Sequence, residues 1–411
     1  MSKVLILNRY RLQSAAFHRW LDPGHELFLL NCGTRAVDRH PEAAAIRERY
    51  TRIAEFDDYI GSAELLATAR EWIRVYGIDT VVAFSEHDVL RAALLRQEFG
   101  LDGQHTASAE AYRDKLRMKR LLDRAGLPVV RYAALEHPGD LERFAARVGY
   151  PVLAKPRTGT GSLGIERIAD DAGAARFAAG QGGALGDYLA EAFTPHELLH
   201  CDGVLVDGRA VFSEVWSWSS TMLAVRNEPT PTMAVTLDRD DPRRATVVRL
   251  AEETLRALPT PRVTAFHIEF FDTADGIVVN EAASRVGGGR IQPALRRLHG
   301  IDLVELAARY QTDSAPERLV ATATAPTGGF LIAYAPDGVR GTAPADCPVP
   351  GISHYESVLP PEDGPAAEVA SSSYLVSAVA LGDDREQTTE RLLAMHRWFL
   401  DHAAFQDRAP H

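Results

Sequence analysis

The sequence predicts a mixed α/β (α+β) fold arranged in three consecutive parts. In the first quarter of the chain, short apolar runs alternate with amphipathic helical patterns, which is typical of a parallel sheet covered by helices. A glycine-rich stretch between two strand patterns follows at 150–168, and two apolar strand patterns joined by a turn lie near the middle, at 266–290. We expect domains at 1–110, 111–312 with a subdomain at about 127–190, and 313–411.

Composition limits the class of protein. The chain has 411 residues, of which 46% are hydrophobic and 25% charged, as in ordinary globular proteins. Its net charge of −11 argues against nucleic acid or an anionic membrane as a partner. The cysteines Cys32, Cys201 and Cys347 are far apart and show no zinc spacing, so we expect a reducing cytoplasm. No apolar run approaches the ~18 residues of a membrane span.

The first part of the chain is predicted to form an α/β lobe of the kind found in nucleotide-binding folds. We expect strands at Val4–Leu7, Glu26–Leu30 and Thr80–Phe84, with helices at Ala63–Tyr76 and His87–Phe99. The first strand is followed by Asn8-Arg9-Tyr10 and not by GxGxxG. The lobe is therefore Rossmann-like in pattern but lacks a dinucleotide fingerprint.

A basic helix opens the second part. It is expected at Arg113–Ala125, because Gly126 and Pro128 form a typical C-terminal stop. Most of its basic residues fit a solvated helix face, and Lys115 is the candidate for a specific role. A shorter helix is expected at Leu141–Val148.

The glycine-rich stretch contains a literal GxGxxG at Gly159, Gly161 and Gly164. A dinucleotide site would need a helix directly after it, whereas Ile165–Ile168 alternates as a strand does. The unit is therefore predicted as a hairpin flap whose small residues let backbone N–H groups approach phosphate oxygens. Lys155, at the end of its first strand, would point toward the same phosphates. Taken alone, the stretch fits a surface loop at least as well.

Two acidic residues, Glu191 and Glu197, lie six positions apart around a bend before the strand that contains Val204. Asp207-Gly208 predicts a hairpin turn after that strand. The polar and aromatic segment Trp216–Pro231 fits a loop that covers a substrate and an ordinary connection equally well.

The middle of the chain holds the central prediction. Strands at His267–Phe271 and Ile277–Glu281, joined by a three-residue loop at Ala274–Gly276, would pair Thr273 with Ile277 and so set Glu269 opposite Glu281. Carboxylates about 5 Å apart repel by roughly 3 kcal/mol at an effective dielectric near 20. Such oxygen ligands favour Mg²⁺ or Mn²⁺ as the compensating cation. The alternative is a surface hairpin with two solvated glutamates.

Arg285, just past this hairpin, would offer a guanidinium fork to a phosphate or carboxylate. The remaining predicted elements flank the hairpin or belong to a small C-terminal α+β lobe. We expect helices at Arg244–Leu258, Leu303–Tyr310 and Asp384–Leu400, strands at Phe330–Tyr334 and Tyr374–Leu381, and a turn at Pro336–Gly338.

Four separated stretches together resemble a known superfamily. They are Asp114-Lys115 with Gly126-Leu-Pro128, Lys155 with GTGSLG, Glu191-x-Phe193 with Glu197-x-x-His200-x-Asp202, and His267-x-Glu269 with Asn280-Glu281-x-x-x-Arg285. In this order they resemble the ATP-grasp superfamily, and within it the carboxylate–amine ligases that form dipeptides and related amides. The likeness is strong over about residues 1–310. It implies an ATP-grasp fold with a Rossmann-like lobe, a flap, a central lobe and a small C-terminal lobe.

The resemblance also implies a role for each matched residue. ATP phosphates would be held by Lys115 and Lys155 beneath a flap formed by Gly159, Gly161 and Ser162. Glu191, with Phe193 beside it, would contact adenine, and Glu197 the ribose. Glu269 and Glu281 would bind Mg²⁺ or Mn²⁺, and Arg285, with Lys155, would stabilise the phosphoryl intermediate.

Two departures from the family pattern affect this assignment. Ala283 stands where many relatives have Asn, so one metal ligand is lost unless Asn280 replaces it. His196 stands where Gly is common, which alters the expected path of the adenine-contacting segment. His267 is on the same strand face as Glu269, where it could contact substrate or be structural.

The implied activity is an ADP-forming ligation of a small-molecule carboxylate to an amine through an acyl phosphate. Carboxylation, thioester formation and a non-catalytic ATP-binding regulatory protein are the alternatives, and a nicotinamide oxidoreductase is disfavoured by the strand after Gly164. A homodimer is one assembly that the sequence leaves open.

Overall fold

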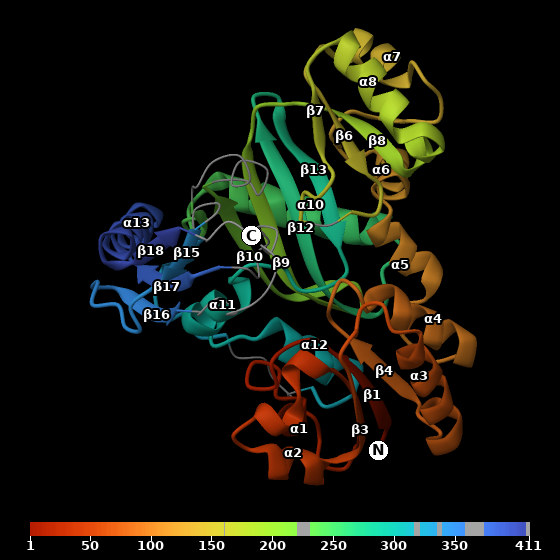
Figure 1. The fold of residues 1–411 in the computed structure, drawn as a ribbon, viewed down its shortest axis with the longest axis vertical. Coiled ribbons are helices and arrows are strands. Elements are labelled where there is room, and N and C mark those ends of the chain that lie inside the picture. The colour runs from red at the N-terminus through yellow and green to blue at the C-terminus, as the bar shows by residue number, and fades with distance from the viewer. Residues whose placement is uncertain (160, 220–230, 316–320, 335–338, 358–373, 408–411) are drawn as a thin grey trace.

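The computed structural model describes residues 1–411 except 160, 220–230, 316–320, 335–338, 358–373 and 408–411. Three sheets form the body of the protein, each with its own helices (Figure 1). None of the helices in the described part of the chain combines the length and apolar character that a membrane crossing requires. Cys32, Cys201 and Cys347 are free thiols.

The N-terminal lobe contains the predicted parallel sheet, in the order β3-β2-β1-β4. Its strands are β1 (Lys3–Asn8), β2 (Glu26–Cys32), β3 (Tyr50–Phe56) and β4 (Thr80–Ala83). The lobe also contains α1 (Phe17–Trp20), α2 (Ala43–Arg49), α3 (Ala63–Tyr76), α4 (Val89–Phe99) and α5 (Thr106–Arg113), with short 3-10 turns at Gly33–Arg35 and Val37–Arg39. The first two predicted strands and helix α3 are confirmed, whereas β3 was not predicted.

The predicted helix at 113–125 is interrupted at Asp114. This residue ends α5 and caps α6 (Lys115–Arg124), its carboxylate accepting hydrogen bonds from the backbone N–H groups of Leu116 (3.0 Å) and Arg117 (3.2 Å). A side-chain oxygen at this position satisfies N–H groups that have no partner within the helix. Lys115 is therefore the first residue of a helix, which fixes its backbone.

The flap is a small four-stranded sheet in the order β5-β8-β6-β7, seen at the top of Figure 1. Its strands are β5 (Tyr132–Ala134), β6 (Val152–Pro156), β7 (Glu166–Ile168) and β8 (Tyr188–Ala192). Helices α7 (Asp140–Val148) and α8 (Asp171–Gln181) and a 3-10 turn at Gly182–Asp187 complete it. The predicted strand after Gly164 is confirmed as β7.

The central sheet has eight strands in the order β13-β12-β9-β10-β11-β14-β17-β16. They are β9 (Glu197–Val206), β10 (Arg209–Trp218), β11 (Thr232–Thr236), β12 (Val263–Thr273), β13 (Gly276–Ala283), β14 (Thr327–Ala333), β16 (Ile352–Ser357) and β17 (Val376–Gly382). The helices are α10 (Pro242–Ala257), α11 (Ile291–His299), α12 (Leu303–Gln311) and α13 (Arg385–His402).

This sheet crosses the expected boundary at 312. Strands β14, β17 and β16, which belong to the predicted C-terminal lobe, continue the central sheet because β14 pairs with β11. A separate two-stranded sheet pairs β15 (Val339–Thr342) with β18 (Ala404–Asp407). The division into three domains stays a prediction. The predicted turn at 336–338 and most of the loop at 216–231 lie outside the described residues.

The central hairpin differs from its prediction in one respect. The loop has two residues, Ala274 and Asp275, and Thr273 pairs with Gly276 instead of Ile277. The predicted three-residue loop was therefore wrong. A bulge between Glu269 and Phe270 shifts the register by one residue, so that Glu269 still faces Glu281. The bulge absorbs one extra residue on β13.

Candidate functional site

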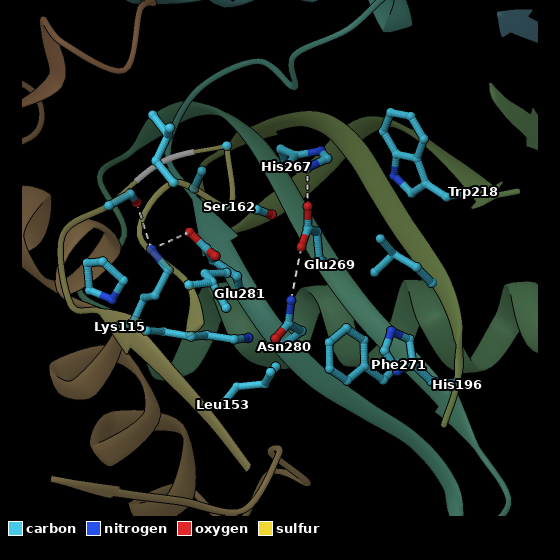
Figure 2. Close-up of a pocket in the computed structure, with 18 of the residues that line it drawn as sticks. Lys115, Leu153, Ser162, His196, Trp218, His267, Glu269, Phe271, Asn280 and Glu281 are labelled. Atoms are coloured by element: carbon cyan, nitrogen blue, oxygen red, sulfur yellow. Dashed lines mark hydrogen bonds and ion pairs between the residues drawn. The ribbon is translucent and has the colours of Figure 1, made fainter. Parts of the chain in front are cut away.

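A cavity of about 510 Å³ lies between the flap, the central sheet and the N-terminal lobe. Figure 2 shows side chains from the flap, from the central sheet and, at Lys115, from α6 turned toward it. Glu86 of the N-terminal lobe also lines it. Its lining includes most of the predicted site residues, namely Lys115, Lys155, Gly159, Gly161, Ser162, Phe193, Glu269, Asn280, Glu281 and Arg285. Two predicted residues, Glu191 and Glu197, do not line it.

Strand alternation explains which side chains face the cavity. On β12, Glu269 and Phe271 line the cavity, whereas Ile268 and Phe270 are buried in the core beneath the sheet. Successive side chains of a strand point to opposite faces, so an apolar core on one side leaves polar residues on the other. Residues two apart on β12 therefore share the cavity.

The bulge on β13 brings an amide beside the two opposed carboxylates. Asn280 Nδ2 donates a hydrogen bond to Glu269 Oε2 at 3.0 Å, while Glu281 Oε1 lies 3.2 Å from Lys115 Nζ. In a regular strand Asn280 and Glu281 would face opposite sides, but both line the cavity here. Two carboxylates and an amide oxygen form a donor set that suits Mg²⁺ or Mn²⁺. The proposed replacement of the lost ligand at Ala283 by Asn280 stays a prediction, which this geometry favours.

Glu269 is held in its ionised form. Burial raises the pKa of its carboxyl group, but the hydrogen bond and charge of His267 outweigh burial and bring the pKa to about 2. The His267 Nε2 atom lies 3.4 Å from Glu269 Oε1. A deprotonated carboxylate is the form that a divalent cation binds.

The two predicted phosphate-binding lysines both line the cavity, from α6 and from β6. Lys115 Nζ donates to the carbonyl oxygen of Gly159 at 2.8 Å, which links helix α6 to the glycine loop of the flap. Lys155, at the end of β6, forms an ion pair with Glu191 at 2.5 Å and lies 5.9 Å from the ring centre of Phe271. The loop itself turns through left-handed backbone at Gly161 and Ser162, both at φ 59°.

Glu191 has two cationic partners behind the cavity. Its carboxylate binds Lys155 and also Lys119 (3.0 Å), whose Nζ donates to the carbonyl oxygen of Asn280 at 3.0 Å. Burial raises the pKa of Glu191, but the charges of Lys119 and Lys155 outweigh burial and bring it to about 2. Sequence reasoning missed Lys119. Its spacing of four from Lys115 on a helix was the available signal.

Arg285 contacts the N-terminal lobe across the cavity. Its Nε donates to Glu86, a residue that follows β4, and its Nη1 donates to the Val286 carbonyl oxygen at 2.7 Å. Glu86 also binds Arg113. Burial raises the pKa of Glu86, and the two arginines lower it to about 2. Glu86 was not predicted, because no local pattern marks an acidic residue after a strand as a partner for an arginine 199 positions away.

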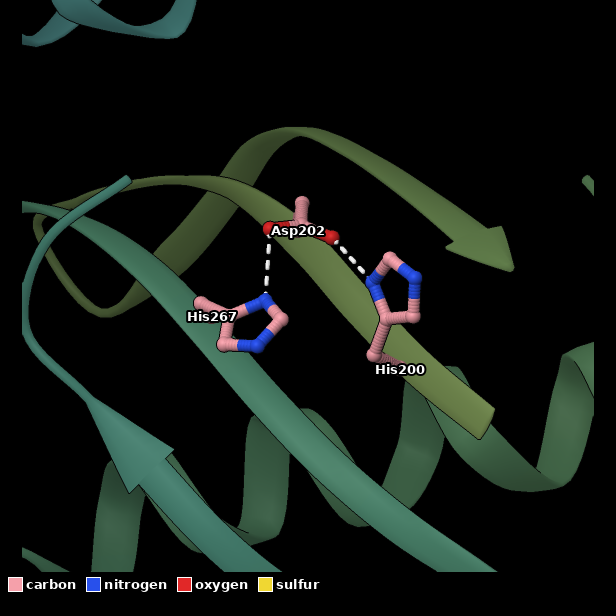
Figure 3. A group of neighbouring side chains, drawn as sticks. All are labelled: His200, Asp202 and His267. Atoms are coloured by element: carbon pink, nitrogen blue, oxygen red, sulfur yellow. Dashed lines mark hydrogen bonds and ion pairs between the residues drawn. The ribbon is translucent and has the colours of Figure 1, made fainter. Parts of the chain in front are cut away.

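A carboxylate lies between two histidines (Figure 3), and one of these, His267, lines the cavity. Asp202 accepts from His200 Nδ1 at 2.6 Å and from His267 Nδ1 at 2.8 Å. The three residues are close enough to hold a metal ion. Both Nδ1 atoms are engaged by the carboxylate, however, so this geometry is that of a hydrogen-bonded network that orients His267 toward Glu269. Burial lowers the pKa of His267, but Asp202 outweighs burial and raises it to about 9.

Glu197 lies on the opposite face of β9 from the cavity-lining Leu198. Its carboxylate binds Arg243 at 2.7 Å and Arg385 at 2.6 Å. The side chain of His196 instead faces the cavity, where its ring stacks on Phe271 with the ring centres 3.6 Å apart. This departure from the expected Gly therefore adds an aromatic surface, which is visible in Figure 2.

Comparison with known proteins finds ligases among the relatives of this chain. No protein-family model matches the chain. The L-arginine-specific L-amino acid ligase of Bacillus subtilis is 24% identical over 351 residues, covering 82% of this chain and 83% of that protein. The L-amino acid ligase of Bacillus licheniformis superposes with a TM-score of 0.75 at 15% identity, covering 100% of this chain and 99% of the other.

A second similar structure contains a nucleotide. The biotin carboxylase domain of 2-oxoglutarate carboxylase from Hydrogenobacter thermophilus, in complex with MgADP, ADP and bicarbonate, superposes with a TM-score of 0.71 at 17% identity. It covers 99% of this chain and 91% of that chain. The fold is that of the ATP-grasp ligases. The resemblance expected from the motifs is therefore confirmed.

Proposed function

We propose that this protein is an ADP-forming ligase that joins the carboxylate of a small molecule, such as an amino acid, to an amine. One observation carries the proposal: Glu269, Glu281, Lys115, Lys155 and Arg285 converge on a single cavity in the fold of ATP-grasp ligases. Each of these charges suits one part of a reaction that moves a phosphoryl group.

The reaction proceeds in two steps. A carboxylate oxygen of the acid attacks the γ-phosphorus of ATP, the bond to the ADP oxygen breaks, and an acyl phosphate forms. The amine nitrogen then attacks the acyl carbon, phosphate leaves, and the nitrogen loses a proton. Little covalent chemistry falls to the protein, whose contribution is to position the reactants and neutralise their charge.

Different residues of the chain neutralise charge, cover the phosphates and hold the metal ion. Lys115 and Lys155 neutralise phosphate oxygens from two sides, and Arg285 stabilises the phosphoryl group as it transfers. The backbone of Gly159 and Gly161 covers the phosphates, which keeps water from the acyl phosphate. Glu269, Glu281 and Asn280 would hold Mg²⁺, which when bound neutralises charge on the phosphates.

The adenine end of the cavity is expected at the stacked rings of His196 and Phe271, near Phe193. The side chains of Glu191 and Glu197 are engaged by lysines and arginines, respectively. We therefore propose that Glu191 acts through Lys155 and that adenine meets the backbone of the 192–195 segment, which lines the cavity.

Three free thiols suit a reducing cytoplasm.

The test is a screen for phosphate release over pairs of amino acids with MgATP, with the products identified by mass. We expect ADP and phosphate to form only when both an acid and an amine are present, together with a product of their summed mass less water. ADP release driven by bicarbonate or a thiol would replace this proposal with carboxylation or thioester formation. Nucleotide binding without turnover under all acceptors would indicate a regulatory protein.

A further inference from the structure

Four arginines gather where the N-terminal lobe meets the last strands of the central sheet. Arg9 and Arg11 follow β1, Arg35 follows β2, and Arg290 precedes α11. Arg290 Nη1 donates to the Tyr374 hydroxyl at 2.9 Å, and its guanidinium lies 5.5 Å from the centre of that ring.

Contacts bring these residues together: Arg11 and Arg290 both bind Glu356. The ends of β1 and β2 are joined because Asn8 Nδ2 donates to Asn31 Oδ1 at 2.9 Å and Asn31 Nδ2 donates to the carbonyl oxygen of Arg35 at 2.9 Å.

The electrostatics agree with these contacts. Burial, and next the charge of Arg11, lower the pKa of Arg35, and Arg9 contributes in the same direction. Arg290 and Arg11 both act on the pKa of Tyr374, which is raised chiefly by burial. We call Arg9, Arg11, Arg35 and Arg290 the arginine cluster.

Within the residues that the structure describes, few carboxylates contact the arginine cluster. Within the described part of the chain, Glu356 is the one carboxylate bonded to it, at 3.4 Å from Arg11 and through a short contact with Arg290. The guanidinium groups of Arg9 and Arg35 have no hydrogen bond or ion pair with any described residue. Among the described residues, one carboxylate is thus bonded to a group of four guanidinium groups, in a protein whose net charge is −11.

Buried donors in the cluster also lack acceptors. The Nε atoms of Arg9 and Arg290 are shielded from solvent and have no hydrogen-bond partner among the described residues. Buried polar groups are nearly always hydrogen-bonded, because burying an unpaired one destabilises the fold. Unpaired arginine donors gathered at one place are typical of a site for an anion.

The cluster lies toward the side of the cavity where Arg285 is proposed to stabilise the phosphoryl group. The hydroxyl of Tyr10, the residue after Arg9, donates to the carbonyl oxygen of Phe84 at 3.0 Å, two residues before Glu86. Glu86, which lines the cavity and binds Arg285, is followed by His87, whose pKa is lowered by burial and next by Arg9. Both Arg9 and Glu86 follow parallel strands, β1 and β4, which are hydrogen-bonded neighbours. Ligands of open α/β sheets bind at this carboxyl end.

We propose that the arginine cluster binds a second anionic group on the acid substrate, so that this enzyme takes an acidic or phosphorylated amino acid. The inference rests on the proposed ligase function and names its substrate class. A side chain with a carboxylate or phosphate would supply the acceptors that Arg9 and Arg290 lack. The cationic side chain of arginine, the substrate in the name of the Bacillus subtilis relative, would be repelled here.

The first test compares acid substrates in the ADP-release assay, with L-alanine as the amine. L-Glutamate, L-aspartate and O-phospho-L-serine are compared with L-leucine and L-arginine. We expect kcat/KM at least about tenfold higher for the anionic acids, the effect of one charge-assisted hydrogen bond. The order among the three identifies a carboxylate or a phosphate as the second group. A preference for leucine or arginine would overturn the inference while leaving the ligase function intact.

Two variants test the site itself. Arg9→Gln and Arg35→Gln remove guanidinium groups that have no bonded partner among the described residues, so we expect both variants to fold with an unchanged melting temperature. Each should raise KM for the best anionic acid about tenfold or more while leaving KM for ATP unchanged. Arg74→Gln is the matched control, because Arg74 is an exposed arginine of the same lobe that forms an ion pair with Glu98 and lies over the ring of Phe99. Equal KM values in all four proteins would contradict the proposal.

Binding of the acid substrate to the arginine cluster can also be measured when no ligation occurs. O-phospho-L-serine and L-glutamate are titrated calorimetrically into the full-length protein saturated with MgADP. Binding to the wild type and to Arg74→Gln, but not to Arg9→Gln or Arg35→Gln, supports the arginine cluster as the site even if no ligation is seen. Failure of both acids to bind the wild type overturns it.

Discussion

At the scale of single residues, Glu281 makes the clearest prediction about activity. Replacing it by Gln in Glu281→Gln removes a charge that would hold Mg²⁺ and that lies 3.2 Å from Lys115. We expect ADP formation to fall by about 10²-fold or more, as when a group that stabilises the transition state is lost. Because the side chain is 36% exposed, folding should change little.

The assay is coupled ADP release, with circular dichroism to follow the melting temperature. Glu110→Gln is the control, because Glu110 is an exposed glutamate on α5. Wild-type activity in Glu281→Gln would exclude this residue from the site.

His267 predicts a dependence of stability on pH. Its pKa is raised from 6.5 to about 9 in the folded protein, mainly through Asp202 acting against burial. The stabilisation is fully present below pH 6.5 and is lost as the pH rises through 9. At about 1.4 kcal/mol per pKa unit, the free energy of unfolding should fall by a few kcal/mol over this window.

Urea unfolding at several pH values, with EDTA present, measures this change. His267→Gln should be flatter than the wild type between pH 6.5 and 9. Parallel curves for the two proteins would show that the histidine is not charged in the fold.

The face of a strand on which a side chain lies was predictable where the alternation of the strand determines it. The alternation around Glu269 correctly predicts which side chains of β12 share a face. No pattern in the sequence marks the bulge that turns Asn280 into the cavity, because a bulge depends on the pairing of two strands. The Lys119–Glu191 pair was likewise hidden, since two charged residues 72 positions apart carry no local signal.

At the scale of elements, α6 connects the flap to the hairpin through two lysines that differ in burial. Lys119 is 1% exposed and holds Glu191 and the Asn280 carbonyl oxygen, whereas Lys115 borders the cavity. Removing one partner of a buried ion pair costs about 3–5 kcal/mol. We therefore expect Lys119→Met to lose about that much stability, and Lys119→Arg to lose less.

Lys115→Met is the matched contrast on the same helix. It should lose activity with a smaller loss of stability, because its partner Glu281 is accessible to water. Chemical denaturation at pH 7 decides between these outcomes. A Lys119→Met protein as stable as the wild type would contradict the buried network.

Elements whose sequence has a strong hydrophobic period were predicted correctly. Others were missed, for physical reasons. Helix α3 matches its predicted bounds because its apolar stripe and its ends are both clear. Strand β3 lies at the edge of its sheet and is mostly unburied, so its sequence lacks an apolar run. Helix α11 contains Pro293, which looks like a break. Proline is accepted in the first turn, where its missing N–H has no partner in any case.

At the scale of the whole molecule, the central sheet predicts that the C-terminal region cannot be removed. A chain of residues 1–312 would lose β14 and expose the edge of β11, whose Ala234 pairs with Phe330. An open strand edge beside an uncovered apolar core favours aggregation. We expect the truncated protein to be insoluble or unfolded.

Soluble expression and circular dichroism measure this outcome. A folded 1–312 fragment that binds MgADP would instead support the separate domain predicted from the sequence. The sequence places the boundary at a polar, Ala- and Thr-rich link, but strand pairing across that link is a long-range property that composition does not report.

The central claim is that the acid is activated as an acyl phosphate. It is tested by supplying the best acid of the screen with ¹⁸O in its carboxylate, together with MgATP and the amine, and measuring the mass of the released phosphate. We expect one ¹⁸O atom in each phosphate, because the attacking carboxylate oxygen leaves with phosphorus. Formation of the amide with phosphate that carries no ¹⁸O would contradict this account.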